Sequence, residues 1–305
     1  MTEIKNPRIL WTISVMLIVV FFCPFTYGNV IYVDNDAAGA NDGSNWENAY
    51  TYLQEALAYA NTADKPVEIR VAQGIYRPNE GLEAIPEFDW RTITFQLIND
   101  VTLMGGYAGI GGADPNERNL QEFKTILSGD LNGDDGLNFT GNSENCYHVV
   151  TGSGTDNTAV LDGFVVTGGN ANDPTRKRYF NGGGLYNIDG SVSIRNCIFT
   201  RNTADTGGGL YCENEAGGVS RPVLENCTFV ANSADRFGGA LVIAADEGFT
   251  SPIISRCEFI QNVANTGGAV WADSLDFEPV TWRDCTFIEN SAMNRGAPSI
   301  SIHVI

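Results

Sequence analysis

Four stretches of the chain repeat one pattern, and they decide the fold: NCIFTRN (196–202), NCTFVAN (226–232), RCEFIQN (256–262) and DCTFIEN (284–290). Each stretch places a cysteine two residues before a phenylalanine and ends on an asparagine. The cysteines recur after 30, 30 and 28 residues. A period in this range is typical of solenoids and propellers.

Glycine pairs followed by a small or aliphatic residue alternate with these stretches, at GGL (183–185), GGL (208–210), GGAL (238–241) and GGAV (267–270). A degraded fifth copy, LDGFVVT (161–167), has Phe164 in the cysteine position. The runs are short and show no helical periodicity. Because a propeller blade needs about 40–45 residues, each unit predicts one coil of a parallel β-helix instead. Equivalent strands of neighbouring coils then lie about 4.8 Å apart.

Stacked coils predict ladders of equal side chains, because the cysteine and the phenylalanine of each stretch share a face. We expect a phenylalanine ladder in the core and an asparagine ladder at a buried corner, where amides satisfy otherwise unpaired groups. The cysteines are expected to form a parallel row of small buried hydrophobes. A disulfide or a thiolate metal site would need convergence instead. Cys146 and Cys212 lie outside this row and receive no assignment.

The alternation of Phe-x-x-Asn with Gly-Gly-aliphatic runs from Gly182 to Ala292. It resembles the repeat of bacterial polymorphic outer-membrane proteins and, more broadly, the pectin-lyase-like β-helix proteins. The resemblance implies an all-β, right-handed parallel β-helix solenoid. It also implies a surface location and a role in adhesion, because members of the polymorphic group are surface adhesins.

The first 28 residues have the features of a secretory signal peptide. Lys5 and Arg8 precede an apolar stretch (9–25), and small residues precede a cleavage site after Gly28. A transmembrane anchor is the alternative, because the stretch approaches the roughly 17–25 residues of a span. No later stretch is apolar enough to cross a bilayer. We therefore expect an exported protein, extracellular or on the outer-membrane surface of a bacterium.

Three further regions are expected after the signal peptide. Residues 29–66 are predicted to form a strand and a helix that caps the N-terminal end of the solenoid. Ser44 and Glu47 fit a capping box at the start of this helix. Residues 67–180 are predicted to form irregular coils, and 181–305 the regular repeats.

The C-terminal end of the sequence shows no recognisable cap. GAPS (296–299) occupies the position of a glycine pair, and an apolar tail follows it. We expect either a truncated reading frame or association with a partner through the uncapped C-terminal end.

The formal net charge of −19 argues against nucleic acid and anionic membranes as partners. An acidic surface keeps an exported protein soluble, and it also attracts cations or basic partners.

One acidic loop is the candidate metal site. Asp130, Asn132 and Asp134 present oxygens at alternating positions, which suits calcium. The EF-hand pattern requires glycine at the sixth position and glutamate at the twelfth, where this chain has Asp135 and Gly141. An Asx-rich turn between coils is the alternative. We expect that no cofactor is required and that calcium is the candidate ion.

The candidate ligand-binding residues are Tyr186, Tyr211 and Trp271, which follow the glycine pairs at positions expected to point outward with Val242. A row of exposed aromatic side chains would bind a glycan or a cell-surface protein. The alternative is that the following loops fold over the row.

No catalytic residue is assigned. Asp205 and Asp235 lie one coil apart, within the separation that glycosidases require, but the next coil has Asn265 at that position. Asparagine suits a turn ladder and would abolish an acid/base pair. The polygalacturonase-like Gly-His-Gly motif is missing, because neither His148 nor His303 lies between glycines.

The sequence therefore predicts a non-catalytic surface or secreted protein used for adhesion, envelope interaction or glycan binding. A polysaccharide lyase or glycoside hydrolase on the same fold and a structural stalk are the alternatives.

Overall fold

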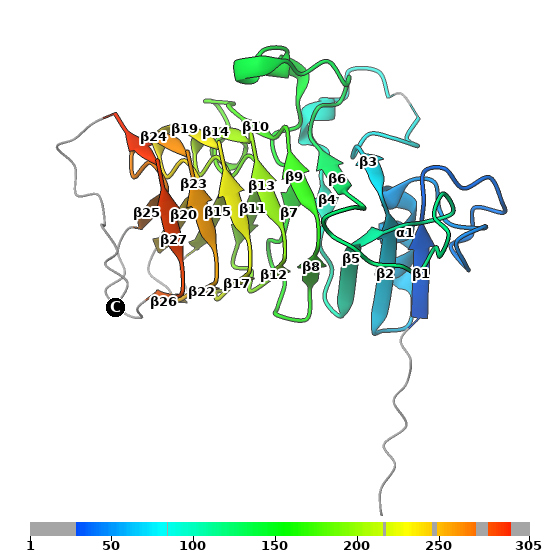
Figure 1. The fold of residues 1–305 in the computed structure, drawn as a ribbon. Helices are drawn as coiled ribbons and strands as arrows, with labels where there is room; N and C mark the ends of the chain where they lie inside the picture. Colours follow the sequence, from blue (N-terminus) through cyan, green and yellow to red (C-terminus); the bar gives the residue numbers. More distant parts are fainter. Residues whose placement is uncertain (1–28, 84, 216–217, 246–248, 273–279, 294–305) are drawn as a thin grey trace, which may run out of the picture.

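The computed structural model describes residues 29–83, 85–215, 218–245, 249–272 and 280–293 (Figure 1). The predicted signal peptide and the expected uncapped C-terminal tail lie outside these residues. The strands form four long parallel sheets along the axis of a solenoid. In Figure 1 the coils lie side by side from β1, in blue, to β26 and β27, in orange to red.

The four sheets are named here by their strands. Sheet 1 contains β1 (Asn29–Val33), β2 (Val67–Ala72), β5 (Val101–Tyr107), β8 (Val160–Asp162), β12 (Ser193–Arg195), β17 (Val223–Glu225), β22 (Ile253–Ser255) and β26 (Thr281–Arg283). Sheet 2 contains β3 (Gly74–Tyr76), β6 (Thr125–Ser128), β9 (Val165–Thr167), β13 (Ile198–Thr200), β18 (Thr228–Val230), β23 (Glu258–Ile260) and β27 (Thr286–Ile288). Sheet 3 contains β4 (Phe95–Gln96), β7 (Val150–Thr151), β11 (Leu185–Ile188), β15 (Leu210–Asn214), β20 (Leu241–Ala245) and β25 (Val270–Ala272). Sheet 4 contains β10 (Asn170–Ala171), β14 (Thr203–Thr206), β19 (Ser233–Phe237), β24 (Val263–Thr266) and β28 (Ser291–Ala292).

The remaining elements are short. A two-stranded sheet pairs β16 (Val219–Ser220) with β21 (Phe249–Thr250). The helices are α1 (Leu53–Thr62) and four 3₁₀ turns, η1 (Trp90–Thr92), η2 (Leu137–Phe139), η3 (Asn142–Glu144) and η4 (Lys177–Tyr179). The prediction of an all-β parallel solenoid is confirmed.

The phenylalanine ladder is present in sheet 2. Phe199, Phe229, Phe259 and Phe287 are paired in register on successive strands. Their ring centroids are 4.9, 5.1 and 4.8 Å apart and the planes are tilted by only 5–8°. The first three rings are fully buried. Stacked aromatic rings therefore fill the core between coils, as the repeat predicts.

The asparagine ladder is also present at the corner that follows sheet 2. The Oδ1 atom of Asn232 accepts hydrogen bonds from the backbone N–H and the Nδ2 atom of Asn202, both at 3.1 Å. The Nδ2 atom of Asn232 donates to the backbone carbonyl of Phe199 at 2.9 Å. Asn262 and Asn290 repeat the pattern in the next two coils. Each amide thus satisfies backbone groups that the turn leaves without partners.

Two rows of left-handed residues explain how a coil turns on either side of sheet 2. One row precedes the cysteines, with φ of 53°, 54°, 52° and 51° at Asn196, Asn226, Arg256 and Asp284. The other precedes the asparagine ladder, with φ of 55°, 54°, 52° and 52° at Arg201, Ala231, Gln261 and Glu289. Asn and Asp tolerate this conformation better than other non-glycine residues. The second row uses less suitable residues and so carries backbone strain.

All six described cysteines are free thiols. The Sγ atoms of Cys227, Cys257 and Cys285 lie 3.6, 3.7 and 3.6 Å from backbone carbonyls of the preceding coil. Burial raises the pKa of Cys197 to about 12. The predicted row of buried free thiols is confirmed for Cys197, Cys227 and Cys257, Cys285 is half-buried, and the low reactivity of the row stays a prediction.

The N-terminal segment differs in detail from the prediction. β1 pairs in register with β2, so the first described strand already belongs to sheet 1. The Ser44–Glu47 capping box is wrong, because α1 begins at Leu53 after Tyr52, whose side chain makes no capping bond. Ser44 instead donates its N–H to the Asp42 side chain, in a local turn that competes with a helix. α1 buries Leu53, Ala56, Leu57 and Ala60 in the main core, and its capping role stays a prediction.

Candidate functional site

The aromatic row predicted to bind a ligand is in register but is not an exposed surface. Tyr186, Tyr211, Val242 and Trp271 are paired on successive strands of sheet 3. Tyr211 is only 5% exposed, Val242 is fully buried, and the other two are half-buried. They belong to a second, smaller hydrophobic cluster that includes Ala244 and Phe237. The alternative made from the sequence, that the loops after these strands fold over the row, stays a prediction, because those loops lie partly outside the described residues.

A continuous ring stack extends the row toward the earlier coils. His148 lies between Tyr179 and Tyr186, with ring centroids at 5.8 and 4.7 Å, and Tyr186 stacks on Tyr211 at 6.1 Å. The Nδ1 atom of His148 lies 2.9 Å from the carbonyl of Gly182. Burial lowers the pKa of His148 to about 4, so the imidazole is neutral at neutral pH.

The loop predicted to bind calcium is held by its own backbone. The Oδ1 atom of Asp130 accepts from the N–H groups of Gly133 and Asp134 at 2.6 and 3.1 Å, and its Oδ2 atom accepts from Asp135 at 3.2 Å. This is the Asx-rich turn that the sequence left as the alternative. Asn132 is exposed on the same loop.

Two of the three predicted metal ligands come together, with a partner that the sequence did not indicate. One carboxylate oxygen from each of Asp130, Asp134 and Glu144 lies within 4.8 Å of the others. Glu144 ends η3, which brings it back over the loop after the left-handed turn at Gly141. No local sequence pattern marks this return. Among the described residues this is the one acidic group with such spacing.

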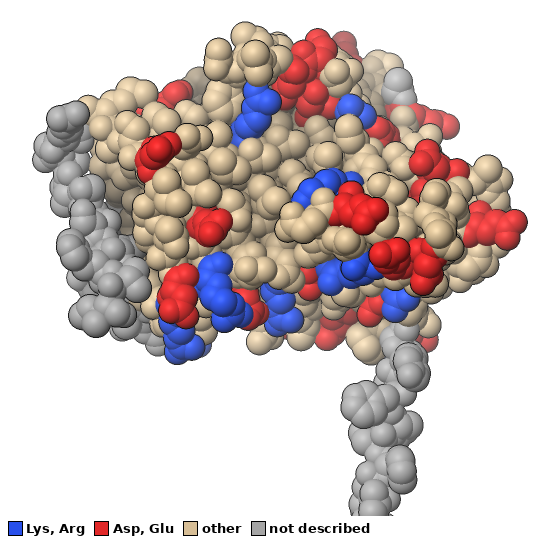
Figure 2. Space-filling view, viewed as in Figure 1, with Lys and Arg blue, Asp and Glu red and all other residues tan. Residues whose placement is uncertain are grey.

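A pocket of about 590 Å³ lies beside this acidic group. It is open to solvent and is formed by residues of the segment between β3 and β4 and of the segment between β6 and β7. In Figure 1, loops in cyan and green rise above the strand ends, and Figure 2 shows acidic side chains gathered at the top of the same view. Apolar walls come from Leu82, Trp90 and Leu131, and polar atoms from Asn79, Arg91, Asn132, Ser143 and Glu144. We call this the loop pocket.

Unpaired acceptor atoms concentrate at the loop pocket. Five buried side-chain polar atoms of the described residues lack a hydrogen-bond partner. Two of them, Asn79 Oδ1 and Glu144 Oε1, belong to residues that line the pocket, and a third, Asn145 Oδ1, belongs to the residue after Glu144. Burial is the largest cause of the raised pKa of Glu144, and the carboxylates of Asp134 and Asp130 act in the same direction. Buried acceptors without donors are costly, so each of them requires a partner such as a water molecule, an ion or a donor group of a ligand.

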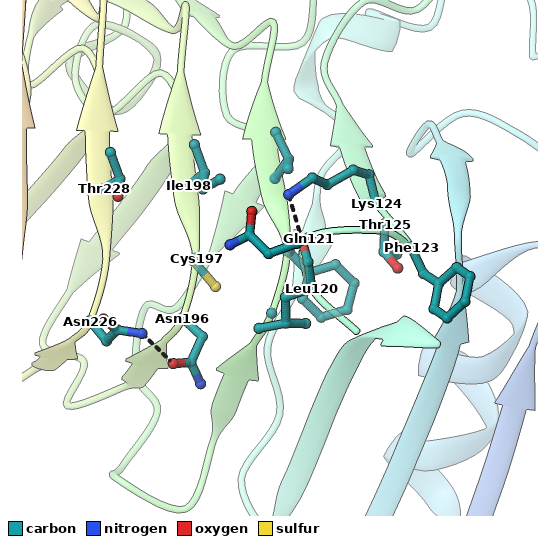
Figure 3. Close-up of a pocket in the computed structure, with 13 residues that line it drawn as sticks. Leu120, Gln121, Phe123, Lys124, Thr125, Asn196, Cys197, Ile198, Asn226 and Thr228 are labelled. Carbon is teal, nitrogen blue, oxygen red and sulfur yellow. Dashed lines mark hydrogen bonds between the residues drawn. The ribbon is translucent and has the colours of Figure 1, made fainter. Parts of the chain in front are cut away.

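A second cavity, of about 180 Å³, lies on the outer face of sheet 2. Figure 3 shows Leu120, Gln121 and Lys124 on one side of it and Asn196, Cys197 and Ile198 on the other. Lys124 donates to the carbonyl of Leu120 at 2.6 Å, so its ammonium group is already used locally.

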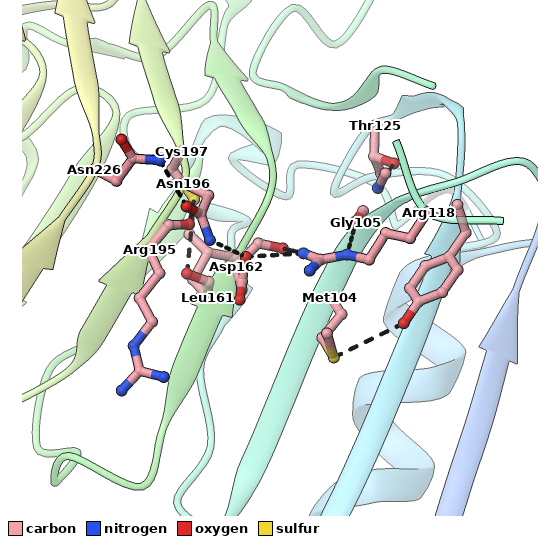
Figure 4. Close-up of polar contacts among 12 residues, drawn as sticks. Met104, Gly105, Arg118, Thr125, Leu161, Asp162, Arg195, Asn196, Cys197 and Asn226 are labelled. Atoms are coloured by element: carbon pink, nitrogen blue, oxygen red, sulfur yellow. Dashed lines mark hydrogen bonds and ion pairs between the residues drawn. The ribbon is translucent and has the colours of Figure 1, made fainter. Parts of the chain in front are cut away.

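Polar side chains beside this second cavity bond to one another. Asp162 Oδ1 accepts from Arg118 and from Asn196, both at 2.8 Å, and Asn226 donates to Asn196 at 2.8 Å (Figure 4). These bonds connect three coils. None of the four side chains that make them has a buried polar atom without a partner. We therefore regard it as structural.

Of the carboxylate pair considered for catalysis, Asp205 is held by structural contacts and Asp235 is exposed. Asp205 is buried, pairs with Arg236 Nε at 2.5 Å and accepts from the Thr206 hydroxyl at 2.9 Å. Asp235 is exposed, and its pKa is raised by partial desolvation and by Asp205.

The repeat geometry can be compared with known families at one coil. Residues 196–213 match the family model described as Chlamydia polymorphic membrane protein (Chlamydia_PMP) repeat. The matched stretch contains β13 and β14 and most of β15. The regular coils thus form a β-helix with repeats similar to those of polymorphic membrane proteins. No curated protein and no solved structure matches the chain significantly.

No helix within the described ranges is both long and apolar enough to traverse a bilayer.

Proposed function

We propose that the chain is an exported surface protein whose β-helix binds a partner, in adhesion or envelope interaction, without catalysing a reaction. The similarity of residues 196–213 to a polymorphic membrane protein repeat supports a surface location. The apolar stretch at 9–25 and the small residues Thr26 and Gly28 before the expected cleavage site support export. The proposal requires no cofactor.

The binding role is inferred from a difference in how two sets of side chains are used. Ladder side chains are occupied in packing and turns, and loop-pocket side chains line a cavity. The Phe and Asn rows of the regular coils are used in packing and in turn hydrogen bonds. The loop pocket instead combines apolar walls with buried acceptors that have no partner. A cavity with a few convergent polar groups is the usual form of a binding site.

A direct test expresses the complete chain in a bacterial host. Antibody labelling of intact cells measures surface exposure, and the purified protein is screened against glycans, envelope components and surface proteins. We expect labelling without permeabilisation and saturable binding in the screen. Retention inside the cell, or no binding in the entire screen, would contradict the proposal.

An activity assay separates binding from catalysis. The purified protein is incubated with acidic polysaccharides in the presence of calcium, and release of new reducing or unsaturated ends is measured. We expect no turnover, because Asp205 is paired with Arg236 and His148 is buried. Turnover would favour the lyase or hydrolase alternative.

A further inference from the structure

The apolar wall of the loop pocket presents an aromatic ring held in place by a neighbour. Trp90 packs edge-on against Phe88, with ring centroids 5.0 Å apart and planes at 73°. Leu82 and Leu131 line the cavity with it. An indole face attracts a cation that approaches it, and the two leucines suit the apolar stem that would carry such a cation.

The unpaired atoms of the pocket are all acceptors. Asn79 uses its Nδ2 atom to donate to the carbonyl of Leu131 at 3.4 Å, which leaves its Oδ1 atom buried without a partner. Glu144 Oε1 is buried without a partner as well. The complementary ligand is therefore a donor, and a primary ammonium group has three donors and no acceptor.

Arg91, which lines the pocket, and Arg77, which bonds to the Asp130 backbone, do not supply this donor. Arg91 directs its guanidinium at the carbonyls of Asn145 and Asn170, at 2.7 and 2.8 Å, and lies 4.2 Å from the ring centroid of Tyr147. Arg77 donates to the carbonyl of Asp130 at 2.8 Å and pairs with Glu80 at 3.1 Å. Their bonds tie the loops to the solenoid, and the carboxylate of Glu144 keeps an acceptor free.

The geometry favours an ammonium group over a calcium ion. Calcium takes six to eight oxygen ligands. Both carboxylate oxygens of Asp130 already accept backbone N–H bonds, so the acidic group offers few free oxygens. The apolar walls add nothing to calcium binding but cover an alkyl stem.

We propose that the loop pocket binds a lysine side chain of a basic partner segment. The alkyl stem lies against Trp90, Leu82 and Leu131, and the ammonium group lies beside the carboxylates of Asp130, Asp134 and Glu144. The net charge of −19 attracts a basic segment to this surface before the side chain enters. The inference rests on the proposed function, since it names the partner chemistry of the same site.

Titration calorimetry on the purified protein, at low ionic strength, tests the pocket. The probe is a twelve-residue peptide of alternating lysine and glycine, and the control is the same peptide with acetylated lysines. We expect the lysine peptide to bind at least about tenfold more tightly, because acetylation removes the charge and two donors. Equal affinity for the two peptides would overturn the inference.

Variants separate the pocket from the general acidity of the protein. Glu144→Gln and Trp90→Ala are each expected to weaken the lysine peptide by about five- to tenfold. Glu258→Gln removes the same charge from the exposed outer face of sheet 2 and is expected to change affinity less than twofold. Equal losses in Glu144→Gln and Glu258→Gln would show non-specific attraction and overturn the inference. Glu144→Gln decides the matter if Trp90→Ala does not fold.

Competition identifies other occupants. Displacement of the peptide by glucosamine at an equal concentration of amine would assign the pocket to an amino sugar. Displacement by an equal concentration of calcium chloride would assign it to a metal ion. Either result overturns the lysine assignment and leaves the proposed function standing. Surface labelling of the 305-residue chain is a separate measurement. Absence of labelling would contradict the proposed function, independently of the result of the peptide titration.

Discussion

The coils before residue 180 and those after it fill the same core row of sheet 2 with different side chains. The earlier coils place Tyr76, Leu127 and Val166 in this row, and the later coils place a phenylalanine in every position. Between sheet 2 and sheet 3, residues 201–209, which include β14, connect β13 to β15 in a later coil, whereas residues 77–94 separate β3 from β4. The regular coils maximise repeated contacts, and the irregular coils extend loops that enclose the loop pocket.

The comparison predicts its largest effect at the phenylalanine ladder. Phe229→Ala removes a ring packed between two others and should lower the free energy of unfolding by about 3–5 kcal/mol. Val166→Ala, in the same row of an irregular coil, should cost about 2 kcal/mol, since it removes fewer buried atoms. Urea unfolding followed by circular dichroism measures both. Equal losses would mean that the regular ladder adds no stability of its own.

Buried asparagines should differ in the same way. Asn232→Ala leaves the carbonyl of Phe199 and the N–H of Asn202 without partners and should cost about 2–4 kcal/mol. Asn145, the residue after Glu144, already has an unpaired Oδ1 atom. Asn145→Ala should therefore cost less, about 1–2 kcal/mol. A larger loss at Asn145 in the same urea experiment would reverse this ranking.

The irregular half should also be the acid-sensitive one, through His148. Its pKa of about 4 lies below the ordinary 6.5, so the unfolded chain binds more protons between these pH values. Stability should therefore fall as the pH decreases from about 6.5 to about 4, by up to about 1.4 kcal/mol per pH unit from this group. His148→Phe keeps an aromatic ring between Tyr179 and Tyr186 and should show a shallower decline. Parallel unfolding curves for the two proteins from pH 7 to 4.5 would contradict this.

The smallest effect should be a gain in a regular coil. Ala231 adopts a φ of 54°, where alanine is strained and glycine is not. Ala231→Gly should raise the free energy of unfolding by about 0.5–1 kcal/mol. The matched control is Ala234→Gly, three residues later inside β19, which should lower it by a similar amount. A loss in both variants would show that the left-handed row carries no strain.

The fold was predictable because the same residue types recur in phase. Phe199, Phe229 and Phe259 occupy equivalent buried positions. Aligning the repeats with one another therefore predicts the strand register, the core residues and the corner residues at the same time. The sequence also indicated the outward position of Tyr211, but not that a second cluster buries it. That burial depends on Phe237 and on neighbouring segments whose approach has no period.

The loop pocket was not predictable for the same reason. Asn79, Trp90 and Glu144 come from segments with no internal repeat, and a single turn at η3 determines that Glu144 returns over Asp130. The acidic loop was recognised from Asp130, Asn132 and Asp134, because adjacent positions need no long-range information. The hydrogen bonds from backbone N–H groups to the Asp130 carboxylate depend on the conformation of the loop, which the residue types alone do not determine.

Because successive coils pair in register, the length of the solenoid is set by the number of coils. Residues 227–256 form one period, and joining Asn226 directly to Cys257 would restore the same Asn-Cys junction. Such an excision would shorten the rod by one strand spacing of about 4.8 Å while each remaining coil keeps equivalent neighbours. Gain or loss of whole periods can therefore change how far the first coils stand from the last ones without altering either.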